Sequence, residues 1–237
     1  MAVVVAPSPS PSSPSRPSRR IRRRVLRGTL IVAVGYLALW ATGALGILGL
    51  SYLAREDTAT PPGTHDLRGV HHFQPVDTEG RLWRGAAPKP DGYGELRRLG
   101  FTTVVDLRAE DLSAAQLAEP GEAGLTAVRL PVRDGQTPTQ AQVRRFLAVV
   151  RDAPGRVFVH CGAGVGRTGT MAAAYLVQTG EESPSAAVRR NLAVGPPSIE
   201  QIYYGLSLER HEAEQPPFPV VALSRLVDAP RRMWSWL

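Results

Sequence analysis

The longest apolar run of the chain lies near its beginning. Residues 29–54 contain no charged side chain. As a helix they would be about 39 Å long, whereas a bilayer core is roughly 30 Å thick. A cleaved secretory signal usually has a shorter apolar region of about 7–15 residues. The pattern therefore predicts one transmembrane helix over residues 29–54.

Beyond residue 80, strand and helix patterns alternate. Short runs of apolar and β-branched residues predict strands at 102–107, 126–132 and 156–160. Helical spacing and capping signals predict helices at 139–151, 166–179, 185–193 and 198–212. This alternation predicts an α/β fold with a central, mainly parallel sheet flanked by helices.

The same pattern divides the chain into five parts. We expect one folded domain, because a single core usually serves about 100–200 residues. The parts are a disordered Pro/Ser-rich and Arg-rich tail at 1–28, the transmembrane helix at 29–54, a linker at 55–80, the domain at 81–213 and a C-terminal tail at 214–237.

The formal net charge of +7 is concentrated at the N-terminus. The first 27 residues contain seven arginines and no acidic residue, and without them the 28 basic residues fall to 21, equal to the number of acidic residues. This neutral remainder argues against nucleic-acid binding, which needs clustered cations. By the positive-inside rule, the arginines predict a single-pass cell-membrane protein with a cytoplasmic N-terminus and an extracytoplasmic domain.

Residues typical of metal sites are scarce. The single cysteine, Cys161, excludes an intrachain disulfide and a zinc site built from several cysteines. His65, His71 and His72 have no acidic or cysteine partner at ligand spacing, so we interpret them as solvated loop histidines. We expect neither a metal nor another cofactor.

Cys161 opens a glycine-rich loop between a predicted strand and a predicted helix. The segment reads His160-Cys161-Gly162-Ala163-Gly164-Val165-Gly166-Arg167-Thr168-Gly169. Its glycines allow successive backbone N–H groups to point inward at the start of a helix, which makes an anion cradle. The predicted phosphate-binding residues are Gly162, Ala163, Gly164, Val165, Gly166 and Arg167.

The residue types in this loop indicate covalent phosphate chemistry. Arg167 can donate two parallel hydrogen bonds to phosphate oxygens. The helix N-terminus and the guanidinium favour a thiolate at Cys161, so we expect this residue to be the nucleophile and to form a phosphocysteine. Thr168 can donate its hydroxyl to the sulfur when the thiolate leaves, and His160 is expected to orient the loop.

A general acid must protonate the leaving oxygen. Asp134 is our candidate, because it follows the predicted strand at 126–132 and precedes a helix, where loops at the carboxyl edge of a sheet converge. An Asp before a Gly is also an ordinary turn. Asp106 lies within a strand, and Asp111 and Asp152 lack comparable placement.

The loop resembles the signature of the protein tyrosine phosphatase superfamily, His-Cys-x-x-Gly-x-x-Arg followed by Ser or Thr. Size and spacing are similar to the compact dual-specificity branch, over about residues 81–210. The resemblance implies the fold of cysteine phosphatases and the covalent mechanism described above. A Trp-Pro-Asp motif is absent, so Asp134 rests on its position alone.

The substrate is a phosphate monoester whose class stays open. The resemblance implies phosphotyrosine, with phosphoserine and phosphothreonine as further candidates. The loop contains no lysine, which argues against a polyphosphorylated inositol. A lipid or sugar phosphate of the cell envelope is the alternative, and an inactive phospholigand-binding module is an alternative of another class. Gln201 either completes a capping box or positions the hydrolytic water.

Overall fold

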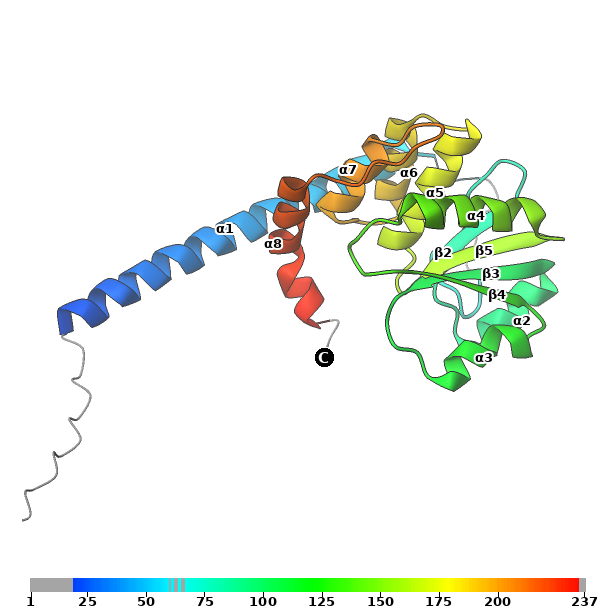
Figure 1. Ribbon diagram of the computed structural model, residues 1–237, viewed down its shortest axis with the longest axis horizontal. Coiled ribbons are helices and arrows are strands. Elements are labelled where there is room, and N and C mark those ends of the chain that lie inside the picture. Colours follow the sequence, from blue (N-terminus) through cyan, green and yellow to red (C-terminus); the bar gives the residue numbers. More distant parts are fainter. Residues whose placement is uncertain (1–18, 60, 62–63, 65–66, 235–237) are drawn as a thin grey trace, which may run out of the picture. The chain divides into compact units, whose positions relative to one another are not determined.

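A five-stranded mixed sheet forms the centre of the protein, which we describe from a computed structural model covering residues 19–59, 61, 64 and 67–234 (Figure 1). The strand order is β1-β2-β5-β3-β4, with β1 antiparallel to β2 and the other neighbours parallel. The strands are β1 (Gln74–Pro75), β2 (Leu82–Ala86), β3 (Phe101–Arg108), β4 (Thr126–Val132) and β5 (Arg156–Cys161). The predicted α/β class and mainly parallel sheet are confirmed.

Helices cover both faces of this sheet (Figure 1). One face carries α4 and α5, with α6 and α7 packed against α5, and the other carries α2 and α3. The helices are α1 (Arg19–Asp57), α2 (Pro90–Arg98), α3 (Ala114–Glu122), α4 (Gln140–Asp152), α5 (Gly166–Thr179), α6 (Pro184–Val194), α7 (Ile199–Leu206) and α8 (Phe218–Trp234).

Each face of the sheet has its own apolar core. Phe146 of α4 and Met171 of α5 are fully buried on one side, and Leu96 of α2 packs with Phe101 and Phe158 on the other. Strands β2, β3 and β5 are therefore buried along most of their length, whereas the edge strand β4 is mostly exposed. Burial on both faces explains the apolar runs in β3 and β5.

Most predicted elements lie within two residues of their expected bounds. The helix predicted at 198–212 is one exception, because α7 ends at Leu206. The chain then turns so that Leu208 and Ala213 pair in an antiparallel bridge and are both buried, and this packing replaces further helical turns. The helix predicted at 29–54 is another exception, because α1 already begins at Arg19, within the tail predicted to be disordered. Helices α2, α3 and α8 had not been predicted.

The folded domain begins earlier than the predicted boundary at residue 81. Strand β1 pairs with β2, and Phe73 and Val76 belong to the apolar cores. Phe73 stacks on Trp83 with a centroid distance of 4.7 Å. Much of the segment interpreted as a linker is therefore part of the fold.

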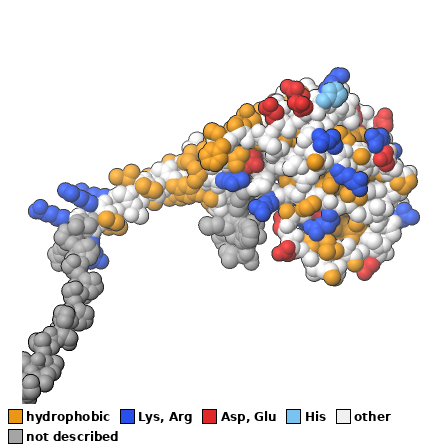
Figure 2. Space-filling view, viewed as in Figure 1, with side chains coloured by type: hydrophobic (Ala, Val, Ile, Leu, Met, Phe, Trp, Pro, Cys, Tyr) orange, Lys and Arg blue, Asp and Glu red, His pale blue; other side chains and the backbone are white. Residues whose placement is uncertain are grey.

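The chain divides into two compact units, Met1–Leu39 and Trp40–Leu237, and the boundary between them falls within helix α1. Among the described residues, the part at Arg22–Asp57 is long and apolar enough to cross a membrane, with arginines at its start (Figure 2). Within the second unit, however, Ser51 and Ala54 are buried against α6, and the Ser51 hydroxyl donates to the Leu192 carbonyl. The last turn of the predicted transmembrane segment is therefore packed on the domain.

Candidate active site

The parallel strands bring four chain segments to one edge of the sheet. In the register of β2, β5 and β3, Ala86 is opposite Cys161 and Asp106 is opposite His160, while Arg108 of β3 is opposite Val132 of β4. The segments that follow these strands therefore start at the same edge. The loop after β5 is the glycine-rich segment predicted to bind phosphate.

The glycine-rich loop turns tightly against the end of β2. Gly164 has a φ of +74°, and a Cβ atom there would lie 2.4 Å from the Ala86 nitrogen, so only glycine fits. The Ala87 N–H donates to the Gly162 carbonyl over 2.9 Å. Helix α5 begins at Gly166 directly after the turn. The loop backbone thus lies at a helix N-terminus, which suits an anion.

Arg167 is buried in this loop and has acidic neighbours. Its Nη1 and Nη2 atoms donate to the two carboxylate oxygens of Glu110, each over 2.8 Å, and Nη1 also donates to the Val132 carbonyl. The Nε atom lies 3.4 Å from Oδ1 of Asp134. The structure therefore brings the predicted acid, Asp134, to the predicted phosphate-binding arginine.

Glu110 is the site residue that the sequence analysis missed. Burial disfavours ionisation of its carboxyl, but the hydrogen bonds and charge of Arg167, together with backbone hydrogen bonds, hold its pKa below the ordinary value. Glu110 lies two residues beyond the end of β3. The rule that identified Asp134, an acid just past a parallel strand, applies equally to Glu110 and could have found it.

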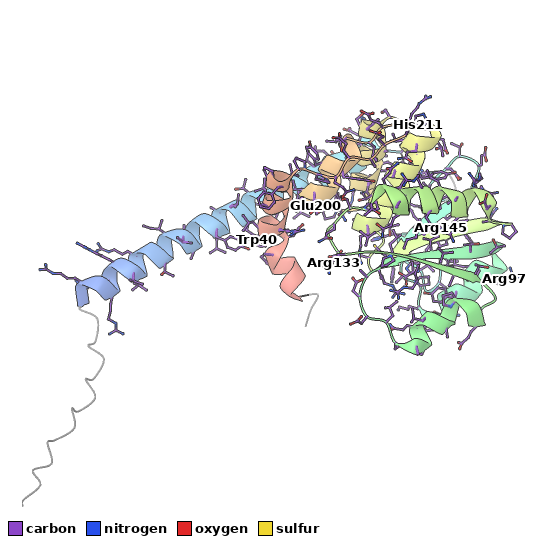
Figure 3. The ribbon with its side chains drawn as sticks, in the orientation of Figure 1. Trp40, Arg97, Arg133, Arg145, Glu200 and His211 are labelled. Atoms are coloured by element: carbon purple, nitrogen blue, oxygen red, sulfur yellow. The ribbon has the colours of Figure 1, made fainter. Side chains whose placement is uncertain are left out.

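The loop that carries Asp134 is held by the start of α7. The Ser198 hydroxyl donates to the Gly135 carbonyl over 2.7 Å, and the Gln201 amide donates to the Gln136 carbonyl over 2.9 Å. Ser198 and Gln201 also complete the predicted capping box. Arg133, on the same loop, is exposed at the surface (Figure 3). The capping residues therefore serve the helix and the site together.

His160 is fully buried beneath the loop. Its Nδ1 atom lies 3.2 Å from the Cys161 carbonyl, which can only accept, so Nδ1 carries the proton. Burial lowers the pKa of His160 to about 4, although Asp106 opposes this shift. The neutral imidazole thus binds the backbone of the residue that opens the loop, and its role in orienting the loop stays a prediction.

This buried histidine should make stability depend on pH. The pKa of this histidine is 6.5 in the unfolded chain and about 4 in the folded chain. Between these values the unfolded state binds more protons, so stability decreases as the pH is lowered. We expect a loss of about 2 kcal/mol in unfolding free energy between pH 7 and pH 5 from this group. Denaturant titrations of wild type, His160→Gln and the exposed-histidine control His211→Gln should show the loss reduced only in His160→Gln. An equal loss in all three proteins would contradict this origin.

The two remaining residues of the predicted machinery are buried. Cys161 is 3% exposed, and the Thr168 hydroxyl makes no hydrogen bond to any described residue. An unpaired buried hydroxyl is costly unless another group satisfies it at some stage of function. Thr168 lies on the first turn of α5, where the predicted leaving thiolate would need a donor.

The histidines of the N-terminal loop have different environments. His71 and His72 are exposed as predicted, and the Nδ1 atom of His72 lies 3.0 Å from the Ala163 carbonyl, at the rim of the glycine-rich loop. His65 lies outside the described residues. Within the described part of the chain, no group of three or more His, Cys, Asp or Glu side chains is arranged to hold a metal ion.

Comparison with known proteins identifies a family that matches this part of the chain. A family model described as "DSP-PTPase phosphatase fused to NAD+ Kinase" matches residues 64–204. The human dual specificity protein phosphatase CDC14C is 37% identical over 90 residues, which are 38% of this chain and 20% of that protein. A probable chloroplastic NAD kinase 2 of Oryza sativa subsp. japonica is 35% identical over 101 residues, or 40% of this chain and 10% of that protein.

Solved structures are similar as well. The crystal structure of P. aeruginosa TpbA gives a TM-score of 0.46 at 25% sequence identity, over 65% of this chain and 95% of that chain. The chain spans a fifth or less of the two curated relatives named above. The family assignment therefore rests on the match over residues 64–204, which is more than half of the chain.

This match includes the β strands, the glycine-rich loop and the start of α7. Several relatives, unlike the NAD kinase, are named as dual specificity or tyrosine-protein phosphatases, which are hydrolases of phosphate monoesters. The resemblance inferred from the loop motif is confirmed. The protein belongs to the compact dual-specificity branch of the protein tyrosine phosphatase superfamily, in the family described as a phosphatase fused to NAD+ kinase.

Proposed function

We propose that this protein hydrolyses phosphate monoesters through a phosphocysteine on Cys161. In the first step the Cys161 thiolate attacks phosphorus, the ester P–O bond breaks, and Asp134 gives its proton to the leaving oxygen. In the second step water attacks phosphorus, Asp134 takes a proton from that water, and the S–P bond breaks. Phosphate leaves, and the thiolate and the protonated acid are restored.

One observation carries this proposal: the paired hydrogen bonds that Arg167 makes. The guanidinium already donates two parallel bonds of 2.8 Å to the planar carboxylate of Glu110, at the N-terminus of α5. A phosphoryl group presents oxygens that can accept the same two bonds. The backbone N–H groups of the loop supply further donors for the charge that develops in the transition state.

Phosphotyrosine in a protein is the substrate class that we favour, with phosphoserine and phosphothreonine next. Curated relatives include proteins named as dual specificity and tyrosine-protein phosphatases. The loop side chains between Cys161 and Arg167 are uncharged, which fits a single phosphate group. A lipid or sugar phosphate of the envelope is the second candidate, because the apolar helix α1 is long enough to hold the chain at a bilayer.

Phosphate release by the full-length chain in detergent tests the function. The full chain is preferable to a fragment from Arg55, since Ser51 and Ala54 pack on α6. We expect release from a phosphotyrosyl peptide in the presence of chelator and reductant, and none from Cys161→Ser. A phosphoseryl peptide and a phosphatidyl lipid compare the substrate classes. Binding of all phosphoesters without release would instead favour a binding module.

The competition between Glu110 and phosphate gives a further prediction. Because Glu110 occupies both Nη atoms of Arg167, a phosphate must exchange for a carboxylate. Arg167 is buried but Glu110 is about half exposed, so solvent weakens the pair and the exchange costs roughly 1 kcal/mol. We therefore expect inorganic phosphate to inhibit Glu110→Gln at about one-fifth of the wild-type concentration. The control Asp111→Asn removes a neighbouring carboxylate and should leave the inhibition constant unchanged. Weaker inhibition of Glu110→Gln would mean that Glu110 holds Arg167 ready for phosphate.

Membrane topology is a separate part of the proposal. We infer a single-pass protein with its N-terminus in the cytoplasm and the phosphatase domain outside, because arginines precede the apolar helix. A tag after Leu237 should be removed by protease added to intact cells. A tag that is fully protected until the cells are lysed would contradict this topology.

A further inference from the structure

Arg84 lies on β2 behind the glycine-rich loop, and it is only 5% exposed. Its Nη2 atom donates to the carbonyls of Gly164 and Val165 over 2.9 and 3.3 Å, and to Oδ1 of Asn191 over 3.0 Å. Its Nε atom is buried and bonds to no described residue. Arg84 therefore fastens the loop to α6.

The charge of Arg84 has no carboxylate partner. Within the described part of the chain, no acidic oxygen forms an ion pair with its guanidinium, and the nearby Arg190 is paired with Glu182 over 2.7 Å. Burial lowers the pKa of Arg84 to about 10, while negative charge at Cys161 acts in the opposite direction. A buried cation without a counter-charge is costly.

Among the described residues, the charged groups around Cys161 leave one guanidinium without a carboxylate partner. They are Arg84 on β2, Asp106 and Arg108 on β3, Glu110 and Asp134 on the loops after β3 and β4, and Arg167 on α5. Asp106 pairs with Arg108, whereas Arg167 faces two carboxylates, and His160 is neutral at pH 7. Arg84 is thus the one cation of this described set whose charge remains available to a thiolate.

We propose that Arg84 is the buried counter-cation of the Cys161 thiolate, and so a positioning residue that keeps the nucleophile ionised from behind the loop. The parallel register of β2 and β5, with Ala86 opposite Cys161, holds the strand of the cation beside the strand of the thiolate. The inference rests on the proposed cysteine chemistry. It also explains why Arg167 can be shared with two acids without loss of the thiolate.

The last glycine of the loop motif belongs to the same network. A Cβ atom on Gly169 would lie 1.5 Å from Oδ1 of Asn191, the oxygen that accepts from Arg84. Any other residue at position 169 would displace the Asn191 amide. The contact with Asn191 therefore requires glycine at position 169, independently of phosphate binding.

Alkylation of the thiol tests the proposal without any substrate. Cys161 is the single cysteine of the chain, so the iodoacetamide rate of the full-length protein, measured against pH, reports on this residue alone. We expect the pH midpoint of alkylation to rise by at least about one unit in Arg84→Met. At acidic pH this corresponds to about tenfold slower alkylation.

Two further variants separate charge from folding. Arg81→Met is the matched control, because Arg81 directly precedes β2 and also donates to backbone carbonyls, those of Val150 and Ala153. It should keep the wild-type midpoint. Asn191→Asp retains the Arg84 side chain but supplies a competing carboxylate of the same shape, and it should raise the midpoint even if Arg84→Met fails to fold.

The outcomes are decisive and distinct from those of the proposed function. A wild-type midpoint in folded Arg84→Met, or in Asn191→Asp, would overturn the inference, and so would an equal rise in Arg81→Met. If the wild-type protein hydrolyses no phosphoester, the proposed function fails while the alkylation midpoints still decide the role of Arg84. If hydrolysis is normal and the midpoints do not move, this inference alone fails.

Discussion

Replacement of Arg167 by lysine should lower kcat/KM by about a thousandfold, because lysine keeps the charge but cannot donate the two parallel hydrogen bonds of the guanidinium. Arg167 is 4% exposed, and the two Nη atoms are held in a plane by the oxygens of Glu110. A lysine ammonium can meet one phosphate oxygen but cannot reach two in the same plane. The loss should appear mainly in kcat, since the paired hydrogen bonds stabilise the charge of the transition state.

Steady-state phosphate release measures this effect. Arg133→Lys is the control, because Arg133 lies on the loop that carries Asp134 and is exposed (Figure 3). We expect wild-type kinetics for the control. Arg167→Lys with kcat within threefold of wild type would mean that a point charge is enough, and the bidentate role of Arg167 would be wrong.

Asp134→Asn should lower kcat by about a hundredfold to a thousandfold for esters of basic alcohols or phenols. The amide cannot give a proton to the leaving oxygen, so the basic limb of the pH–rate profile should disappear. Esters with an acidic leaving group need little protonation, and their hydrolysis should fall much less. This pattern depends on Asp134 standing near the phosphoryl group, and Arg167 lies 3.4 Å from its carboxylate.

The pH profile and the leaving-group series test the assignment together. Asp152→Asn is a suitable control, because Asp152 is an exposed acid at the end of α4 that pairs with Arg151. A full basic limb in Asp134→Asn would show that another group is the acid. Glu110 would then be the next candidate, since its carboxylate lies on the other side of Arg167.

Much of the fold can be predicted from local patterns. The strand that ends in Cys161 agrees with the structure. The capping box of α4 lies at Thr139 and Gln142, two residues beyond the box predicted at Thr137 and Gln140. Helix α5 has the predicted bounds, since glycines confine its start and Gly180 with a φ of +82° ends it. These signals are local in sequence, so they survive tertiary packing.

Other features depend on contacts between distant segments. Helix α8 follows the dipeptide Pro216-Pro217 and contains Pro230, and it forms where Val227 packs into the fold. The burial of Phe73 depends on its stacking with Trp83. The roles of Ser198 and Gln201 in holding the Asp134 loop required the chain path. A helix-capping motif does not reveal which loop it also binds.

The residues of the candidate site also fall into those that local sequence reveals and those that depend on contacts between distant segments. Cys161, Arg167 and the glycines could be found because one continuous segment carries them. Glu110 and Arg84 lie on other strands or loops, and their partners were not visible from spacing. The position of Glu110 just past β3 could be read from the sequence. Its pairing with Arg167, and the contacts of Arg84 with the loop, need the strand order β2-β5-β3-β4.

The most direct test of the account is the covalent intermediate. Full-length protein, wild type and Asp134→Asn, would be mixed with a phosphotyrosyl peptide that carries radiolabelled phosphate, quenched in acid during turnover and digested. The account predicts label on the peptide that contains Cys161, and none in Cys161→Ser. Turnover with no label on that peptide, together with an active Cys161→Ser variant, would contradict it.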